Sequence, residues 1–107
     1  MKTEVSECPL EGALLLLSGR WRTLILYSLS AGPMRFNALQ RDIPGVSQQM
    51  LSRDLKELEN AGVVSRTVNP TVPPQVEYAL TNAGERLIPI LKELGDWWAV
   101  TRNQDAA

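Results

Sequence analysis

One segment of this 107-residue chain, residues 45–81, restricts the possible fold more than any other. It begins with a helical pattern that Ser47 can cap at the N-terminus. Gly62 can end the helix, because glycine adopts the positive φ common just beyond a helix C-terminus. Leucines repeat along one side at helical spacing: Leu51, Leu55 and Leu58. The opposite side is polar, with Ser52 at its edge, and carries Gln49, Arg53, Lys56 and Asn60. Residues 47–61 are therefore predicted to form an amphipathic helix with one face in solvent.

A β-hairpin is predicted directly after this helix. Residues 63–68 and 75–80 are two short runs rich in strand-forming residues. Residues 69–74 lie between them and include three prolines, which cannot continue a strand ladder. This proline-rich piece is therefore predicted to be the tip of the hairpin.

Further helices are predicted on both sides of this segment. Pro9 suits the first turn of a helix, Asn37 can cap a short one, and Thr81 or Asn82 can cap a long one. The predicted helices cover about residues 8–18, 20–30, 38–43 and 82–101, with an extended piece at residues 34–36. These elements predict an α+β fold, mostly helical, in one domain over residues 1–107. It is a winged helix-turn-helix with an extra helix at each end; residues 37–61 form the helix-turn-helix and residues 63–80 the wing.

The charge is distributed unevenly, although the net charge is only −1. Residues 20–66 hold seven basic and four acidic residues, whereas the two flanks together hold four basic and eight acidic residues. A basic middle between acidic ends fits contact with a polyanion by the middle and with a protein partner by the ends. Ordinary surface charge explains the same distribution, and charge alone does not decide between the two.

Composition argues against several other classes of protein. The chain has no histidine, and its one thiol therefore has no histidine partner, so an enzyme is not expected. One cysteine allows no disulfide within the chain. The apolar run at residues 13–17 is too short to span a membrane. We expect a cytoplasmic protein with no membrane contact, no metal site and no cofactor.

The polar face of the helix at residues 47–61 suits contact with DNA. Glutamine can pair with adenine and arginine with guanine in the major groove, which favours Gln49 and Arg53 as base contacts. Lys56 is better placed for a phosphate. The alternative is a solvated helix face, but the following hairpin favours a nucleic-acid interface. The predicted DNA-binding residues are Arg20, Arg35, Arg41, Ser47, Gln48, Gln49, Ser52, Arg53, Lys56, Arg66 and Gln75.

The sequence resembles the HxlR family of bacterial winged-helix transcriptional regulators, relatives of the MarR group. The resemblance covers nearly the whole chain, from Cys8 to Trp98. It is carried by residues 8–11 (Cys-Pro-Leu-Glu), 19–21 (Gly-Arg-Trp), 32–37 (Gly-Pro-Met-Arg-Phe-Asn), 44–47 (Pro-Gly-Val-Ser), Leu51, Leu55, 57–59, 62–66 and 72–81. One departure is Gln75 near the wing tip, where the family commonly has a basic residue.

The resemblance implies a homodimer that binds a palindromic double-stranded DNA operator and represses or activates a gene. It also implies dimerisation through the first and last helices. The apolar arc of the last helix is wider than a core-facing stripe needs, which agrees with this. The predicted interface residues are Leu10, Leu14, Leu87, Ile90, Leu91, Leu94, Trp97 and Trp98. We expect Trp21 in the core and at least one of Trp97 and Trp98 in the interface.

Cys8 is a candidate redox sensor. It precedes Pro9 at a helix N-terminus, where the partial positive charge favours the thiolate, although Glu7 and Glu11 act against this. In several members of the HxlR family, which this sequence resembles, a cysteine at this place senses oxidants or electrophiles. The alternative is an inert cysteine packed at a helix start.

Two other functions stay open at this point. A winged-helix module that binds proteins would fit the near-neutral charge and the uncharged wing tip. A small-molecule or electrophile effector held between the terminal helices would fit the tryptophans there.

Overall fold

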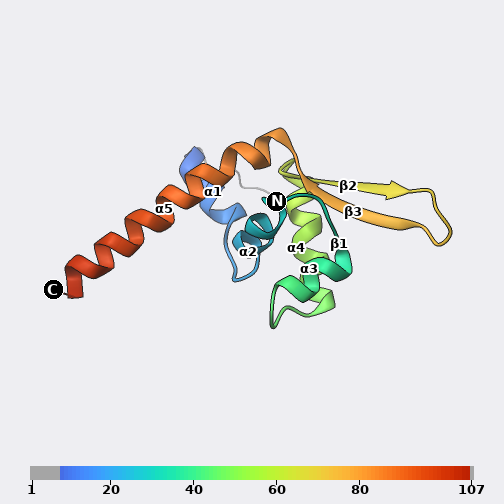
Figure 1. Ribbon diagram of the computed structural model, residues 1–107. Helices are drawn as coiled ribbons and strands as arrows, with labels where there is room; N and C mark the ends of the chain where they lie inside the picture. The colour runs from blue at the N-terminus through green and yellow to red at the C-terminus, as the bar shows by residue number, and fades with distance from the viewer. Residues whose placement is uncertain (1–7, 107) are drawn as a thin grey trace.

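The computed structural model describes residues 8–106, and within them it contains five helices and three strands. In chain order they are α1 (Pro9–Leu16), α2 (Arg22–Leu29), β1 (Met34–Arg35), α3 (Phe36–Asp42), α4 (Gln48–Asn60), β2 (Val64–Asn69), β3 (Gln75–Leu80) and α5 (Asn82–Ala106) (Figure 1). The predicted fold class, mostly helical with a small sheet, is confirmed. Of the predicted domain, residues 1–7 and 107 lie outside the described part. No helix in residues 8–106 combines the length and apolar composition that a membrane crossing needs.

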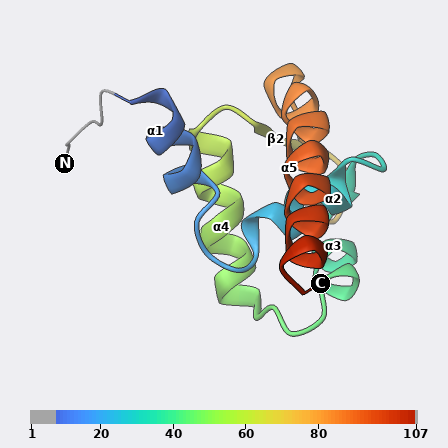
Figure 2. The same cartoon turned by 90° about the vertical axis from the view of Figure 1, so that its left-hand side faces the viewer.

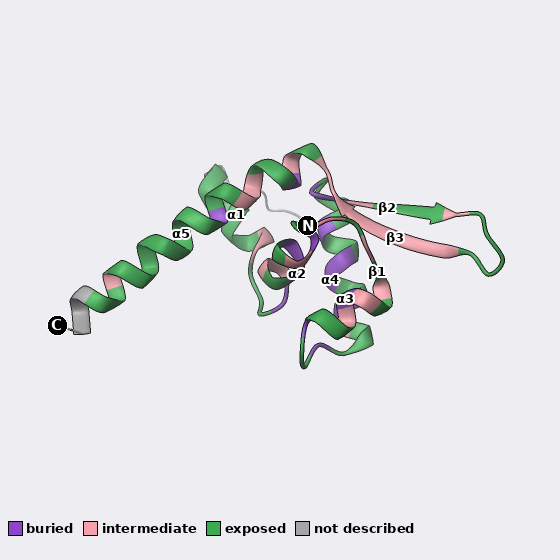
Figure 3. Ribbon diagram, viewed as in Figure 1, coloured by how far each residue is buried: buried purple, intermediate pink, exposed green. Residues whose placement is uncertain are grey.

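The hydrophobic core lies where α2, α3 and α4 meet the base of the sheet. Its most buried members come from all of these elements: Ile25, Leu26, Leu39, Leu51, Leu55, Leu58 and Val64. Trp21, at 7% exposure, belongs to the same cluster, which confirms its predicted place in the core. Figure 3 shows burial concentrated around α2 and α4, whereas α1 and residues 92–100 of α5 are mostly exposed.

The local signals at both ends of α4 act as predicted. The Ser47 hydroxyl accepts a hydrogen bond from the Met50 backbone N–H at 3.1 Å and so caps the first turn. Gly62 has a φ of +83°, in the left-handed region that favours glycine. These two residues define the ends of α4, and the buried Leu51, Leu55 and Leu58 determine which of its faces is exposed.

The wing is an antiparallel hairpin of β2 and β3, with β1 on the other side of β3. Its register pairs Val64 with Leu80 at the base and Asn69 with Gln75 next to the tip. Thr81 ties the base of the wing to its neighbours. Its hydroxyl donates to the Gly62 carbonyl at 2.6 Å and accepts from the Gly84 N–H at 3.1 Å. Thr81 therefore caps α5 while holding it beside the end of α4.

Several details differ from the prediction. The prediction that Asn37 caps α3 is wrong, because α3 begins at Phe36, two residues before its predicted start at residue 38, and Asn37 lies inside the helix. The N-cap is instead Arg35, whose extended backbone belongs to β1. Pairing of β1 with β3 therefore sets the start of α3. In addition, α1 ends at Leu16 rather than Ser18, and α5 continues past Thr101.

The two terminal helices lie apart within one chain. Figure 1 shows α5 extending away from the body on the side opposite the wing. In Figure 2, α1 lies on one side of α4 and α5 on the other. α1 contains no buried residue, and α5 exposes Leu94, Trp97, Trp98 and Val100 beyond its first turns.

Candidate nucleic-acid interface

The polar face of α4 points outward, as its sequence pattern predicts. Leu51, Leu55 and Leu58 are at most 1% exposed and anchor the helix on the core. Gln49 and Lys56 lie on the exposed side of the same helix. A helix held by one face and open on the other is accessible to a DNA groove.

The first group of predicted residues meets at the N-terminal half of α4. Together they line one surface hollow: Ser47, Gln48, Gln49, Ser52 and Arg53. Amide, hydroxyl and guanidinium groups are the donors and acceptors that pair with base edges. The predicted base-contacting residues are therefore adjacent in space and face the same side.

The second group joins α4 to the wing. Ser52 and Lys56 line a polar hollow together with Arg66 of β2 and Tyr78 of β3. Glu59 lies in the same hollow and reduces its positive charge. Ser52 belongs to both hollows, so the surface is continuous from the start of α4 to the wing.

The other predicted residues are more dispersed. Arg35 and Arg41 line a third hollow near β1 and α3, which Glu77 shares. The Arg20 guanidinium lies over the ring of Trp21, with its carbon 4.9 Å from the ring centroid. Gln75 lies beside the wing tip and lines none of these hollows.

Sequence reasoning missed two residues that shape this surface, Arg22 and Asp54. Asp54 is 3% exposed and is the one buried charged residue in the described part of the chain. Its Oδ1 atom accepts from Arg22 Nε at 3.2 Å and lies 3.5 Å from Arg53 Nε. A usable signal was present, because helical spacing from Leu51 and Leu58 places Asp54 on the apolar side.

The predicted interface residues are mostly exposed in the single chain. Leu10, Ile90 and Trp97 are each at least 60% exposed, and Leu14, Leu94 and Trp98 lie between 48% and 53%. Leu91 differs from the others: it is 6% exposed and packs mainly in the core of its own chain. Leu87 is half-buried against the same core. Both point inward because the first turns of α5 cover α2, whereas later turns extend beyond it.

An apolar groove runs between α2 and α5. It is lined by Thr23, Tyr27, Leu91, Leu94, Gly95, Trp97 and Trp98. The rings of Trp97 and Trp98 lie with centroids 6.1 Å apart, and Arg102 lies over Trp98 at 5.7 Å. These aromatic groups are therefore at the surface, unlike Trp21.

Cys8 is exposed and lies at the N-cap position of α1. Pro9 follows it as the first residue of the helix. The predicted position at a helix start is confirmed. Glu7, an acidic neighbour expected to act against the thiolate form of Cys8, lies outside the described residues.

The buried leucines of α4, its exposed polar face and the hairpin behind it define a winged helix-turn-helix protein. A family model described as HxlR-like helix-turn-helix matches residues 16–106. The chain belongs to this family of transcriptional regulators.

Individual relatives agree with this assignment. The HTH-type transcriptional regulator YkvN of Bacillus subtilis is 44% identical over 100 residues, covering 94% of this chain and 85% of YkvN. A MarR-family regulator structure from Porphyromonas gingivalis W83 superimposes with a TM-score of 0.80 and 35% identity, covering 92% of this chain and 97% of its own. The reduced form of the redox regulator HypR gives a TM-score of 0.81 and 39% identity, with coverages of 89% and 94%.

Proposed function

We propose that this regulator is a homodimer that binds double-stranded DNA in a sequence-specific manner. The observation that carries the proposal is the outward polar face of α4, anchored from behind by Leu51, Leu55 and Leu58. In each subunit α4 enters a major groove, where Gln49 and Arg53 contact base edges. Two subunits related by a twofold axis then occupy half-sites about one helical turn apart.

The surrounding polar residues supply contacts to the DNA backbone. Lys56 and Arg66 flank the hollow between α4 and the wing, and they are placed for phosphates on one side of the groove. Arg35 and Arg41 are placed for phosphates on the other side. Arg20 is a further phosphate contact, whereas Gln75 gives the wing an uncharged contact. Wing binding is therefore weaker than a basic tip would give.

Dimerisation in this proposal uses the faces that one chain leaves uncovered. Leu10 and Leu14 of α1 are exposed, as are Ile90, Leu94 and Trp97 of α5. Exposed apolar surface on two helices of one small domain is typical of a protein–protein interface. The groove between α2 and α5 belongs to the same surface.

A gel-shift assay tests DNA binding directly. The protein is mixed with the DNA upstream of its own gene and with random DNA of equal length, at moderate salt. We expect a shift of the upstream DNA that persists when random competitor is added. A protein-interaction module would shift neither DNA, and that outcome would refute the proposal.

The redox role of Cys8 is a separate proposal, supported by its exposure and by the likeness to the redox regulator HypR. Two Cys8 thiols of one dimer form a disulfide when an oxidant such as diamide accepts their two electrons and two protons. Alternatively, the Cys8 thiolate adds to an electrophile such as a quinone. We expect a diamide-induced covalent dimer on non-reducing gels that Cys8→Ser abolishes. If neither diamide nor a quinone changes DNA binding of the wild type, Cys8 is not a sensor.

A reversible small-molecule effector requires a different test. The groove between α2 and α5, with Trp97 and Trp98 on its wall, is where an aromatic effector would bind. Thermal stabilisation by aromatic compounds that persists in Cys8→Ser would indicate such binding without thiol chemistry.

A further inference from the structure

The position of Arg22 is unusual for an arginine. It is the first residue of α2, where the helix dipole disfavours positive charge. Its Nη1 atom donates to the Leu16 carbonyl at 2.9 Å. Leu16 is the last residue of α1, so no N–H group of its own helix donates to its carbonyl. Arg22 therefore holds the C-terminal end of α1 in place.

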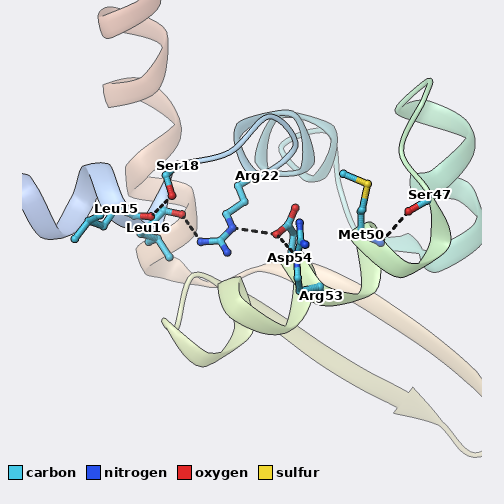
Figure 4. Close-up of polar contacts among 8 residues, drawn as sticks. All are labelled: Leu15, Leu16, Ser18, Arg22, Ser47, Met50, Arg53 and Asp54. Atoms are coloured by element: carbon cyan, nitrogen blue, oxygen red, sulfur yellow. Dashed lines mark hydrogen bonds and ion pairs between the residues drawn. The ribbon is translucent and has the colours of Figure 1, made fainter. Parts of the chain in front are cut away.

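The same guanidinium group reaches the α4 helix. Arg22 Nε donates to Asp54 Oδ1 at 3.2 Å, and Arg53 Nε approaches the same oxygen at 3.5 Å (Figure 4). The Asp54 side chain is 5% exposed, whereas that of Arg53 is 62% exposed. A continuous chain of polar contacts thus runs from the Leu16 carbonyl through a buried carboxylate to a side chain on the DNA-facing surface.

We infer that Arg22 and Asp54 are positioning residues that couple the place of α1 to the conformation of Arg53. The two guanidinium groups contact the same carboxylate oxygen, so their positive charges repel each other and each weakens the binding of the other to Asp54. While Leu16 anchors Arg22, Arg53 is held loosely and can extend toward a base. When α1 moves with its Leu16 carbonyl, Arg22 leaves Asp54, and Arg53 becomes the sole partner of that buried charge.

The consequence for DNA binding rests on the proposed function. Arg53 drawn back onto Asp54 is less available to the major groove, so sequence preference falls while phosphate contacts such as that of Lys56 persist. Because α1 is also a proposed dimerisation helix, a change in dimer geometry reaches Arg53 by this route. A buried ion pair that only stabilised the fold would have no such effect on Arg53.

The first test needs no DNA. Arg22→Lys keeps the charge but has one donor group at its tip, so it cannot reach Leu16 and Asp54 through separate nitrogens. We expect the Arg53 Nε–H signal in nitrogen–proton spectra, assigned by its loss in Arg53→Lys, to shift in Arg22→Lys. The matched control Arg86→Lys, at an exposed site on α5, should leave it in place. An unchanged Arg53 signal in Arg22→Lys would overturn the coupling.

A second variant protects this test against misfolding. Asp54→Asn keeps the shape of the side chain but removes the charge that attracts Arg53. The Arg53 signal should therefore move in the direction opposite to its shift in Arg22→Lys. Movement in the same direction in both variants would indicate a general disturbance of the fold and would contradict the inference.

The second test measures the ratio of affinities for operator and random DNA. We expect Arg22→Lys to lower this ratio about tenfold, the scale of one base contact, with random-DNA affinity changed by less than about twofold. Arg53→Ala added to Arg22→Lys should then cause little further loss. Independent losses that add would overturn the inference. Failure of the wild type to bind any DNA would instead refute the proposed function, and the spectra would still test the coupling.

Discussion

Arg22 Nε lies 3.2 Å from Asp54 Oδ1, and this contact joins the start of α2 to the buried side of α4. Asp54 is 3% exposed, so its carboxylate has lost most of its hydration. The lost hydration is offset by two guanidinium groups, one of them largely buried. A charge in this position depends on its partners, because an unpaired buried charge is strongly unfavourable.

Removing one partner should therefore destabilise the fold. We expect Asp54→Ala to lower the free energy of unfolding by about 3 kcal/mol, because Arg22 loses its counter-charge and a cavity remains. Urea denaturation measures this. The control Asp96→Ala, on the exposed face of α5, should change the free energy by less than about 0.5 kcal/mol. A loss of unfolding free energy in Asp54→Ala as small as that in Asp96→Ala would show that the ion pairs of Asp54 do not stabilise the fold.

Two glycines of α5 should respond to alanine in opposite directions. A Cβ on Gly84 would overlap the Val63 backbone carbonyl, whereas one on Gly95 would meet nothing within 4 Å. We expect Gly84→Ala to cost about 2 kcal/mol through displaced backbone. Gly95→Ala should add up to about 1 kcal/mol, because alanine favours a helix. Thermal unfolding compares the two, and a stable Gly84→Ala would mean that α5 does not approach Val63 this closely.

The proposed dimer interface makes a prediction about subunit association. Ile90→Glu, at a site 61% exposed, should convert the dimer to a monomer, because a carboxylate would have to be buried in an apolar interface. Sedimentation velocity measures the assembly state. Val72→Glu is the control, since Val72 is fully exposed in the turn between β2 and β3, which lies on the side of the molecule opposite α5 (Figure 1), and it should leave the dimer intact. A dimeric Ile90→Glu protein would place the interface elsewhere.

Local sequence signals predicted most of the fold, because they act over a few residues. The Ser47 cap, the positive φ of Gly62 and the leucine spacing of α4 each depend on one turn of helix. Together they fixed which face of α4 is exposed, and with it most of the candidate site. The strand β3 was also predicted with its observed bounds, 75–80.

The sequence was least informative where contacts between distant segments determine the start of a helix or the partner of a side chain. Asn37 has good capping chemistry, but pairing of β1 with β3 starts α3 one residue before it. Leu91 has the spacing of an interface residue, and only the packing of α5 against the core shows how deeply it is buried within its own chain. The Arg22–Asp54 pair spans 32 positions, so no local pattern could join the two residues. The one local indication was Asp54 itself, a charged residue on the otherwise apolar side of α4.

The most direct test of DNA binding by α4 compares variants of its outward face on two DNAs. Affinities for operator and random DNA are measured over a salt series for Arg53→Ala, Lys56→Ala and the control Lys92→Ala, an exposed lysine of α5. We expect Arg53→Ala to lose about 1–3 kcal/mol on operator alone. Lys56→Ala should weaken both and reduce the salt slope by about one, and Lys92→Ala should resemble the wild type. Equal losses on both DNAs for Arg53→Ala, or no loss for either α4 variant, would contradict the account.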